Sequence, residues 1–205
     1  MRTLLIEPHY LGSIEYFSLL SQYDSIILEV TDRFPKQTYR NRCYLLGSNR
    51  VLMLTIPVNF SSRTITKDVT IDQSQRWRKD HWGAFFSSYG KAPFFEYFAD
   101  DIREVWEKPT QYMVDLLVRF LEIFLKFLRK SATLALSTSV ENLNTSDLRN
   151  VILPKQSFTD RGIYRAVPYN QSFGTSFTPN LSILDLLMNE GPRAEEILSA
   201  SFLTT

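Results

Sequence analysis

The sequence predicts an α/β fold, with a single domain in which a small parallel or mixed sheet is flanked by helices. Three observations support this prediction. Two short apolar runs near the start are separated by a helical pattern, as in a strand, helix, strand unit. Helical periodicity then dominates residues 73–130. Finally, the length of 205 residues suits one domain with one hydrophobic core, spanning residues 1–205.

Residues 1–72 are expected to be rich in strands. Thr3–Ile6 is apolar and is followed by Pro8, which cannot donate to a sheet ladder, so it predicts a short buried strand. Ser13 is suited to cap a helix. The β-branched run Ser25–Val30 predicts a second buried strand. A right-handed connection between two parallel strands is then the simplest topology.

A polar and basic loop is expected over residues 31–49, leading into a hairpin. Its first strand is Cys43–Leu46, and its second is Val51–Val58, the clearest strand pattern in the chain. The run Val69–Ile71 predicts a small edge strand.

Helices are expected over residues 73–130. Ser74 caps a first helix that ends near Gly90, and Pro93 opens a second. A long amphipathic helix follows over Met113–Leu128, where apolar residues recur at intervals of three and four.

Residues 131–205 are expected to be rich in loops. Thr133–Thr138 predicts a later strand, and Leu181–Asn189 a short helix capped by Asn180. Pro192 opens a terminal helix. The segment 141–180 is long for a loop in a compact domain, which suggests a binding lid or disorder.

Composition argues against several classes of protein. The net charge of +1, from 23 basic and 22 acidic residues, creates no global field that would attract nucleic acid. The single cysteine, Cys43, excludes an intramolecular disulfide and fits the reducing cytoplasm. The most apolar segment, residues 113–128, is interrupted by charged residues, so no membrane span is expected. We therefore expect a cytoplasmic protein without a nucleic-acid partner.

The stretch Arg76–Phe98 combines cations with aromatic rings and is a candidate binding wall. Trp77, Arg78 and Lys79 suit a phosphate, carboxylate or sugar-nucleotide group. The alternative is an amphipathic helix that buries Trp77 and Phe85 and leaves Arg76, Lys79 and Asp80 in solvent.

Six sequence blocks are distributed along nearly the whole chain: IEPHYLGSIEYF, NR at 41–42, LTIPV, QRWRKDHW, YGKAPFFEYF and FTPNLSILDLLMNEGP. Together they resemble the WbqC-like protein family. The chain departs from the family's usual start at Glu7, Gly12, Ser13 and Glu15, and its segment between Thr138 and Tyr169 is shorter than in longer members. The resemblance implies a bacterial protein linked with surface-polysaccharide or O-antigen biosynthesis, and an acyl or aminoacyl transferase.

Three residues are candidates for catalysis. His9 follows the first strand, at the end where open α/β sheets bind ligands. His81 lies in the central stretch, and either imidazole can act as general acid or base. Asp185 interrupts an apolar helix; facing inward it needs a partner such as Arg42, Arg78 or His81, and otherwise it faces solvent.

A small-molecule anionic donor is expected as substrate, either a sugar nucleotide or an acyl or aminoacyl donor. Its predicted binding residues are Tyr10, Asn41, Arg42, Trp77, Arg78, Lys79 and Gln171. No metal site is expected, because two histidines in separate blocks are few, and the sequence indicates neither a cofactor nor an oligomeric state. The alternative is a non-enzymatic scaffold for partner enzymes, which would expose Trp82, Phe86 and Phe95 as one patch.

Overall fold

A computed structural model describes residues 2–138 and 145–203 of the chain. Its first half contains the elements β1 (Thr3–Ile6), α1 (Ile14–Leu20), β2 (Ser25–Leu28), β3 (Arg42–Leu46), β4 (Val51–Thr55), β5 (Val58–Asn59), η1 (Thr66–Asp68), β6 (Thr70–Ile71), α2 (Trp77–Tyr89) and α3 (Phe95–Glu107). Its second half contains α4 (Met113–Phe127), β7 (Thr133–Leu136), β8 (Thr145–Asp147), η2 (Phe158–Asp160), α5 (Ile183–Glu190), η3 (Gly191–Arg193) and α6 (Ala194–Ser201).

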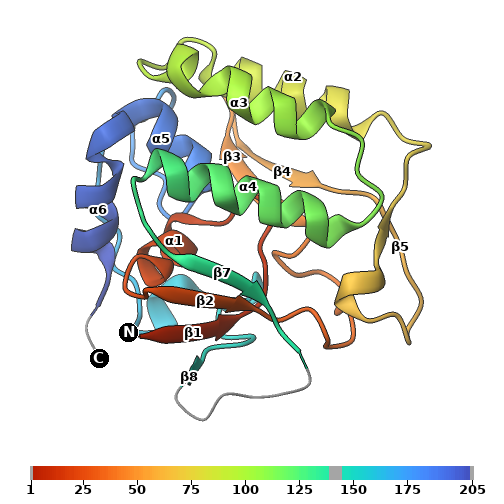
Figure 1. The fold of residues 1–205 in the computed structure, drawn as a ribbon. Helices are drawn as coiled ribbons and strands as arrows, with labels where there is room; N and C mark the ends of the chain where they lie inside the picture. Colours follow the sequence, from red (N-terminus) through yellow and green to blue (C-terminus); the bar gives the residue numbers. More distant parts are fainter. Residues whose placement is uncertain (1, 139–144, 204–205) are drawn as a thin grey trace.

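The predicted α/β fold is confirmed, and its central sheet is parallel. Four strands lie in the order β7-β2-β1-β8, and all three of their pairings are parallel. The two central strands are the apolar runs, as expected for strands buried on both faces. The outer strands β7 and β8 are largely exposed. In Figure 1, α4 runs between this sheet and the pair α2 and α3.

The hairpin and the small edge strand are also confirmed. Strands β3 and β4 pair in antiparallel fashion, and β6 pairs with β5. The predicted strand Val51–Val58 is wrong in extent, because it is divided between β4 and β5. Ile56 and Pro57 lie between the two parts, and proline supplies no ladder donor at that point.

Two expectations for the C-terminal part need correction. The segment 141–180 contains a strand, β8, that pairs with β1, and residues 139–144 lie outside the described residues. The helix α5 is capped by Ser182 rather than Asn180, since the Ser182 hydroxyl accepts from Leu184 N. Asn180 instead accepts from the backbone N–H of Glu15 at 3.0 Å and so holds this segment on α1.

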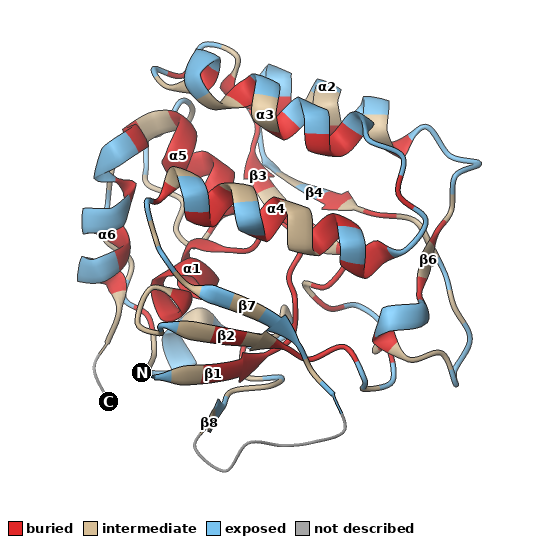
Figure 2. Ribbon diagram, in the orientation of Figure 1, coloured by how far each residue is buried: buried red, intermediate tan, exposed pale blue. Residues whose placement is uncertain are grey.

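The hydrophobic core lies between the sheet and the helices. Figure 2 shows buried residues along β1, throughout α1 and on the inner faces of α2 to α5. Every residue of α1 is buried, including Glu15, whose carboxylate pairs with Arg161. Among the described residues, no helix is long and apolar enough to cross a membrane.

Candidate functional site

The parallel strands bring polar side chains to one edge of the sheet. Glu7 follows β1 directly and Glu29 follows β2. Ser137, after β7, donates to Glu29 Oε1 at 3.0 Å, and Arg149, after β8, donates to Glu29 Oε2 at 3.0 Å. The backbone N–H of Asn150 donates to Glu7 Oε2 at 2.9 Å. This is the edge beyond the carboxyl ends of the strands, where open α/β sheets bind their ligands.

Glu7 and His9 form a buried pair at this edge. His9 Nε2 lies 3.4 Å from Glu7 Oε1, and the imidazole stacks on the Tyr16 ring with centroids 4.2 Å apart. Burial lowers the pKa of His9 below its ordinary value of 6.5, against the opposing effect of the Glu7 carboxylate. Burial would raise the pKa of Glu7, but its hydrogen bonds and the Arg40 charge lower it. At neutral pH the pair is therefore a carboxylate beside a neutral imidazole.

The pairing determines which nitrogen of His9 carries the proton. An ionised carboxylate only accepts hydrogen bonds, so the proton lies on Nε2, which faces Glu7. His9 Nδ1 is then the basic nitrogen, and it is buried without a hydrogen-bond partner among the described residues. His9 Nδ1 is therefore a basic nitrogen whose lone pair is not used by the described residues.

Arg40 completes the group, and the sequence reasoning did not select it. Its guanidinium is fully buried, and Nη2 donates to Asp32 Oδ2 at 2.6 Å. Nε and Nη1 have no hydrogen-bond partner in the described part of the chain. The Arg40 charge lowers the pKa of both Glu7 and His9. Two nitrogens of Arg40 and the basic nitrogen of His9 are thus buried without partners among the described residues, and the three electrostatically linked residues are called the Glu7–His9–Arg40 group.

Backbone contacts explain why Arg40 reaches this edge. The backbone N–H of Tyr10 donates to the carbonyl of Tyr39 at 2.9 Å, so the basic loop lies alongside the segment that follows β1. Asn41 anchors the other side, because its Nδ2 donates to the carbonyl of Ile56 at 3.1 Å. Asn41, predicted as a binding residue, is thus occupied in holding the loop.

His81 belongs to a different hydrogen-bonded group. Trp106 Nε1 donates to the Tyr10 hydroxyl at 2.8 Å, and that hydroxyl lies 2.7 Å from His81 Nδ1. A further hydrogen bond joins His81 to the backbone of Thr55, and burial lowers the pKa of the imidazole to about 4. These contacts engage the polar groups of both His81 and Tyr10 inside the protein.

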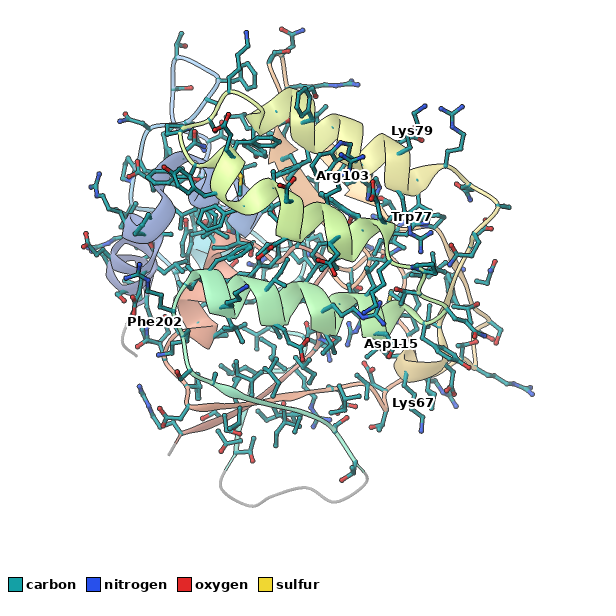
Figure 3. The ribbon with its side chains drawn as sticks, turned by 45° about the horizontal axis from the view of Figure 1, so that its top comes forward. Lys67, Trp77, Lys79, Arg103, Asp115 and Phe202 are labelled. Atoms are coloured by element: carbon teal, nitrogen blue, oxygen red, sulfur yellow. The ribbon has the colours of Figure 1, made fainter. Side chains whose placement is uncertain are left out.

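The predicted donor-binding residues of α2 divide between core and solvent. Trp77 is buried, with its ring edge-on to His81 at 5.2 Å, whereas Lys79 is exposed on the outer side of the helix (Figure 3). The Arg78 guanidinium stacks over the Trp77 ring at 4.5 Å and donates to Gln73 Oε1 at 2.5 Å. The burial of Trp77 and Phe85 and the exposure of Lys79 match the amphipathic alternative.

Asp185 faces inward and is fully buried. Its Oδ2 accepts from the Tyr169 hydroxyl at 2.5 Å and from Gln171 Nε2 at 2.8 Å. These neutral partners replace the arginine or histidine that the sequence suggested. The two hydrogen bonds hold the 169–171 segment against α5, and burial raises the pKa of the carboxyl group.

A cavity of about 1160 Å³ lies away from the Glu7–His9–Arg40 group. Of the predicted site residues, Gln171 lines it, and His9, Arg42, Arg78 and His81 do not. The predicted residues are therefore distributed over several parts of the fold. The sequence could have indicated Glu7, because this acid directly follows a predicted apolar strand. It could not indicate Glu29, which lies within the predicted strand 25–30, nor Arg40 and Arg149, because only tertiary contacts bring them there.

Comparisons with known proteins identify similar sequences but no similar solved structure. A model of the WbqC-like protein family matches residues 7–161 and 152–197. The uncharacterized protein Rv1507c of Mycobacterium tuberculosis is 26% identical over 226 residues, which cover 96% of this chain and 97% of the relative. No solved structure matches the chain.

Proposed function

This chain belongs to the WbqC-like protein family, and from that premise we propose that it is a transferase of bacterial surface-polysaccharide biosynthesis. It moves an acyl, aminoacyl or related group from an activated, anionic donor to an acceptor hydroxyl or amine. The observation that carries the proposal is the Glu7–His9–Arg40 group, whose basic nitrogen and two N–H donors are buried and unsatisfied. Unsatisfied buried groups are rare in native proteins and are frequent where a substrate completes the bonding.

Each member of the group has a role in acyl transfer. His9 Nδ1 takes the proton of the acceptor as its oxygen or nitrogen bonds to the donor carbonyl carbon. The oxyanion that forms accepts hydrogen bonds from Arg40 Nε and Nη1. The intermediate collapses, the bond to the leaving group breaks, and His9 returns the proton to that group. Glu7 keeps the Nε2 proton in place and stabilises the transient imidazolium.

Other predicted residues are proposed to hold the donor. Arg42 Nε, Trp77 Nε1 and two nitrogens of Arg78 are buried without hydrogen-bond partners in the described part of the chain, which supports this role. Burial raises the pKa of Tyr10, the neighbour of His9 in sequence, and the nearby Arg78 charge partly opposes that shift. Arginine is suited to such a role because its planar fork binds phosphate and carboxylate oxygens in pairs.

The alternative of a non-enzymatic scaffold has less support. It needs Trp82, Phe86 and Phe95 on the surface together, but Phe95 is only 8% exposed and Trp82 is half-buried. Phe86, at 56%, is the exposed member of the three. His81 does not line the cavity of about 1160 Å³ either. We therefore assign the role of general base to His9, on the grounds of the Glu7–His9–Arg40 group.

The proposal is tested by His9→Gln in a reconstituted polysaccharide pathway. Loss of a general base is expected to lower the transfer rate by about 10²- to 10⁴-fold. The wild-type rate should rise with pH through the His9 pKa, which lies below 6.5, and should be level at neutral pH. Lys67→Ala, which changes an exposed lysine on η1, is the control and should keep the full rate. A folded His9→Gln protein with the wild-type rate would exclude the proposed chemistry.

A further inference from the structure

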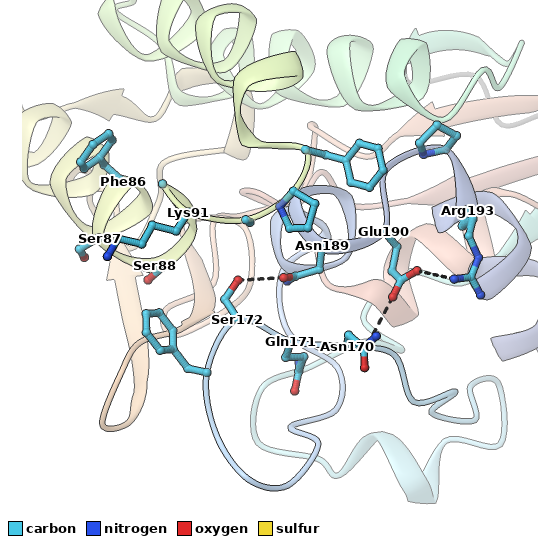
Figure 4. A pocket seen from close by; sticks show the side chains of 16 residues that line it. Phe86, Ser87, Ser88, Lys91, Asn170, Gln171, Ser172, Asn189, Glu190 and Arg193 are labelled. Atoms are coloured by element: carbon cyan, nitrogen blue, oxygen red, sulfur yellow. Dashed lines mark hydrogen bonds and ion pairs between the residues drawn. The ribbon is translucent and has the colours of Figure 1, made fainter.

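The cavity of about 1160 Å³ is formed by three segments that are distant in sequence (Figure 4). The end of α2 and the linker to α3 form one wall, through residues 86–94. Residues 170–173 form the second, and the end of α5 with η3 forms the third, through residues 189–193. The cavity is about as large as the largest ordinary small-molecule sites, which span about 300–1,000 Å³.

The first and third walls are fixed to each other. The backbone N–H of Phe94 donates to the carbonyl of Met188 at 3.0 Å. The Phe94 ring also lies directly against Gly191, where an added Cβ would overlap the ring. Gly191 has φ +52, a conformation that side chains larger than hydrogen disfavour. The glycine therefore permits both the turn after α5 and the close approach of the ring.

The second wall is held by side chains that bond across it. Gln171 donates to the carbonyl of Thr178 at 2.9 Å and accepts from its N–H at 2.8 Å. Ser172 donates to Asn189 Oδ1 at 2.8 Å, and the backbone N–H of Asn170 donates to Glu190 Oε1 at 3.3 Å. A pocket with walls fixed in this way loses little conformational entropy when a ligand binds.

The lining offers ring faces, positive charge and, as described below, one buried hydroxyl. Phe86, Phe94 and Phe173 supply ring faces. Lys91 and Arg193 supply positive charge at the two ends of the close-up view (Figure 4), although Glu190 already pairs with one nitrogen of Arg193 at 3.1 Å.

Ser88 adds a hydrogen-bonding group that nothing in the described residues uses. It is 2% exposed, it lines the cavity, and its hydroxyl has no hydrogen-bond partner among those residues. A buried hydroxyl without a partner costs free energy, which a ligand atom can recover.

We propose that this cavity binds the nucleoside diphosphate portion of a ligand. Such a group carries a flat ring to stack on phenylalanine, phosphate oxygens for Lys91 or Arg193, and ribose hydroxyls or base edge atoms for Ser88. Sugar nucleotides and coenzyme A thioesters share this chemistry. The inference goes beyond the proposed function and is independent of it, because no residue of the Glu7–His9–Arg40 group lines the cavity.

Titration calorimetry of the full chain tests the proposal, with uridine diphosphate, adenosine diphosphate, coenzyme A, uridine and pyrophosphate as probes. At least one diphosphate nucleotide is expected to bind more tightly than uridine or pyrophosphate alone. Preference for uridine diphosphate indicates a sugar nucleotide, and preference for adenosine diphosphate and coenzyme A indicates a thioester.

Variants then place the bound nucleotide in the cavity. Phe173→Ala should weaken binding by about 5- to 150-fold through loss of stacking, and Lys91→Ala by about tenfold through loss of a charged hydrogen bond. Lys67→Ala, an exposed lysine outside the cavity, should bind as the wild type does. Absence of nucleotide binding, or binding that neither cavity variant weakens, would overturn the proposal, and in either case the His9→Gln result stands by itself.

Discussion

At the residue scale, burial and neighbouring groups together set the protonation states of Glu7 and His9. Neither residue type is unusual in a loop after a strand. Together in a dry environment, however, they settle into one protonation state, a carboxylate beside a neutral imidazole, because burial disfavours the charged imidazole and the neighbours of Glu7 favour its ionised form.

The pair is expected to make the protein sensitive to acid. The pKa of Glu7 lies below 4.5 in the folded protein, and that of His9 below 6.5. In both cases the unfolded chain binds more protons as the pH falls, so folding loses stability first below 6.5 and then below 4.5. Between pH 7 and about pH 3.5 the Glu7 carboxylate should contribute a loss of about 1.4 kcal/mol to the wild type that Glu7→Gln lacks.

Urea unfolding at a series of pH values measures this difference. Comparison within one pH series cancels the other acidic residues, which are the same in both proteins. Parallel pH profiles for the wild type and Glu7→Gln would show that the pair carries no such linkage.

At the element scale, α5 supports the cavity through one buried carboxyl group. Asp185 accepts hydrogen bonds from Tyr169 and Gln171, and Gln171 in turn lines the cavity. An acid inside an apolar helix is costly, but here it fixes a long segment of irregular chain to a helix of eight residues.

Two substitutions at Asp185 separate its charge from its hydrogen bonds. Asp185→Asn keeps an acceptor for Tyr169 and Gln171, so the free energy of unfolding at neutral pH should fall little. Asp185→Leu removes the acceptor of the half-buried Tyr169 hydroxyl and of one N–H of Gln171, and should lower it by about 2 kcal/mol. Urea unfolding gives the values, and proteolysis within residues 169–178 should accelerate for Asp185→Leu alone. Equal stability of the two variants would contradict this role.

The wild type supplies an independent check at this position. The pKa of Asp185 is raised above 3.8 in the folded protein, so the folded chain binds more protons than the unfolded chain above that pH. Its contribution to stability therefore falls as the pH rises through the raised pKa. Asp185→Asn should lack this component of the pH profile.

At the scale of the whole molecule, one hydroxyl joins the sheet to the helical layer. Tyr10 follows β1, His81 lies on α2 and Trp106 on α3, and the Tyr10 hydroxyl bonds to both partners. This link explains why a histidine that looks catalytic in sequence is engaged inside the protein.

Tyr10→Phe removes that hydroxyl and leaves His81 Nδ1 and Trp106 Nε1 without a partner. The free energy of unfolding should fall by about 2–4 kcal/mol, since two buried polar groups lose their hydrogen bonds. Tyr97→Phe is the matched control: Tyr97 is 77% exposed, and the change should be within about 0.5 kcal/mol. Urea unfolding measures both variants. Equal unfolding midpoints for Tyr10→Phe and Tyr97→Phe would contradict the proposed link through the Tyr10 hydroxyl.

The candidate site was only partly predictable, for reasons that particular residues illustrate. His9 was selected because the end of a parallel strand is a common place for ligands. The sequence predicts Arg42, and not Arg40, as the binding residue of the basic loop. The two arginines lie in one basic loop, and nothing local distinguishes them. The side chain of Arg40 is buried because the backbone of Tyr39 bonds to Tyr10, a contact between segments that the sequence does not relate.

The sequence by itself determined the family, the α/β class, the parallel pair β1 and β2, the antiparallel hairpin and the three long helices. Each of these is encoded locally, in apolar runs, in helical periodicity and in turn residues. Only the tertiary structure decided that β7 and β8 flank the central pair. Strand β8, with the sequence TSD, has no apolar pattern; its extended form comes from hydrogen bonding to β1. The Glu7–His9–Arg40 group is of the same kind, because burial and proximity are properties of the folded chain, and neither is written in the loop sequence that supplies these residues.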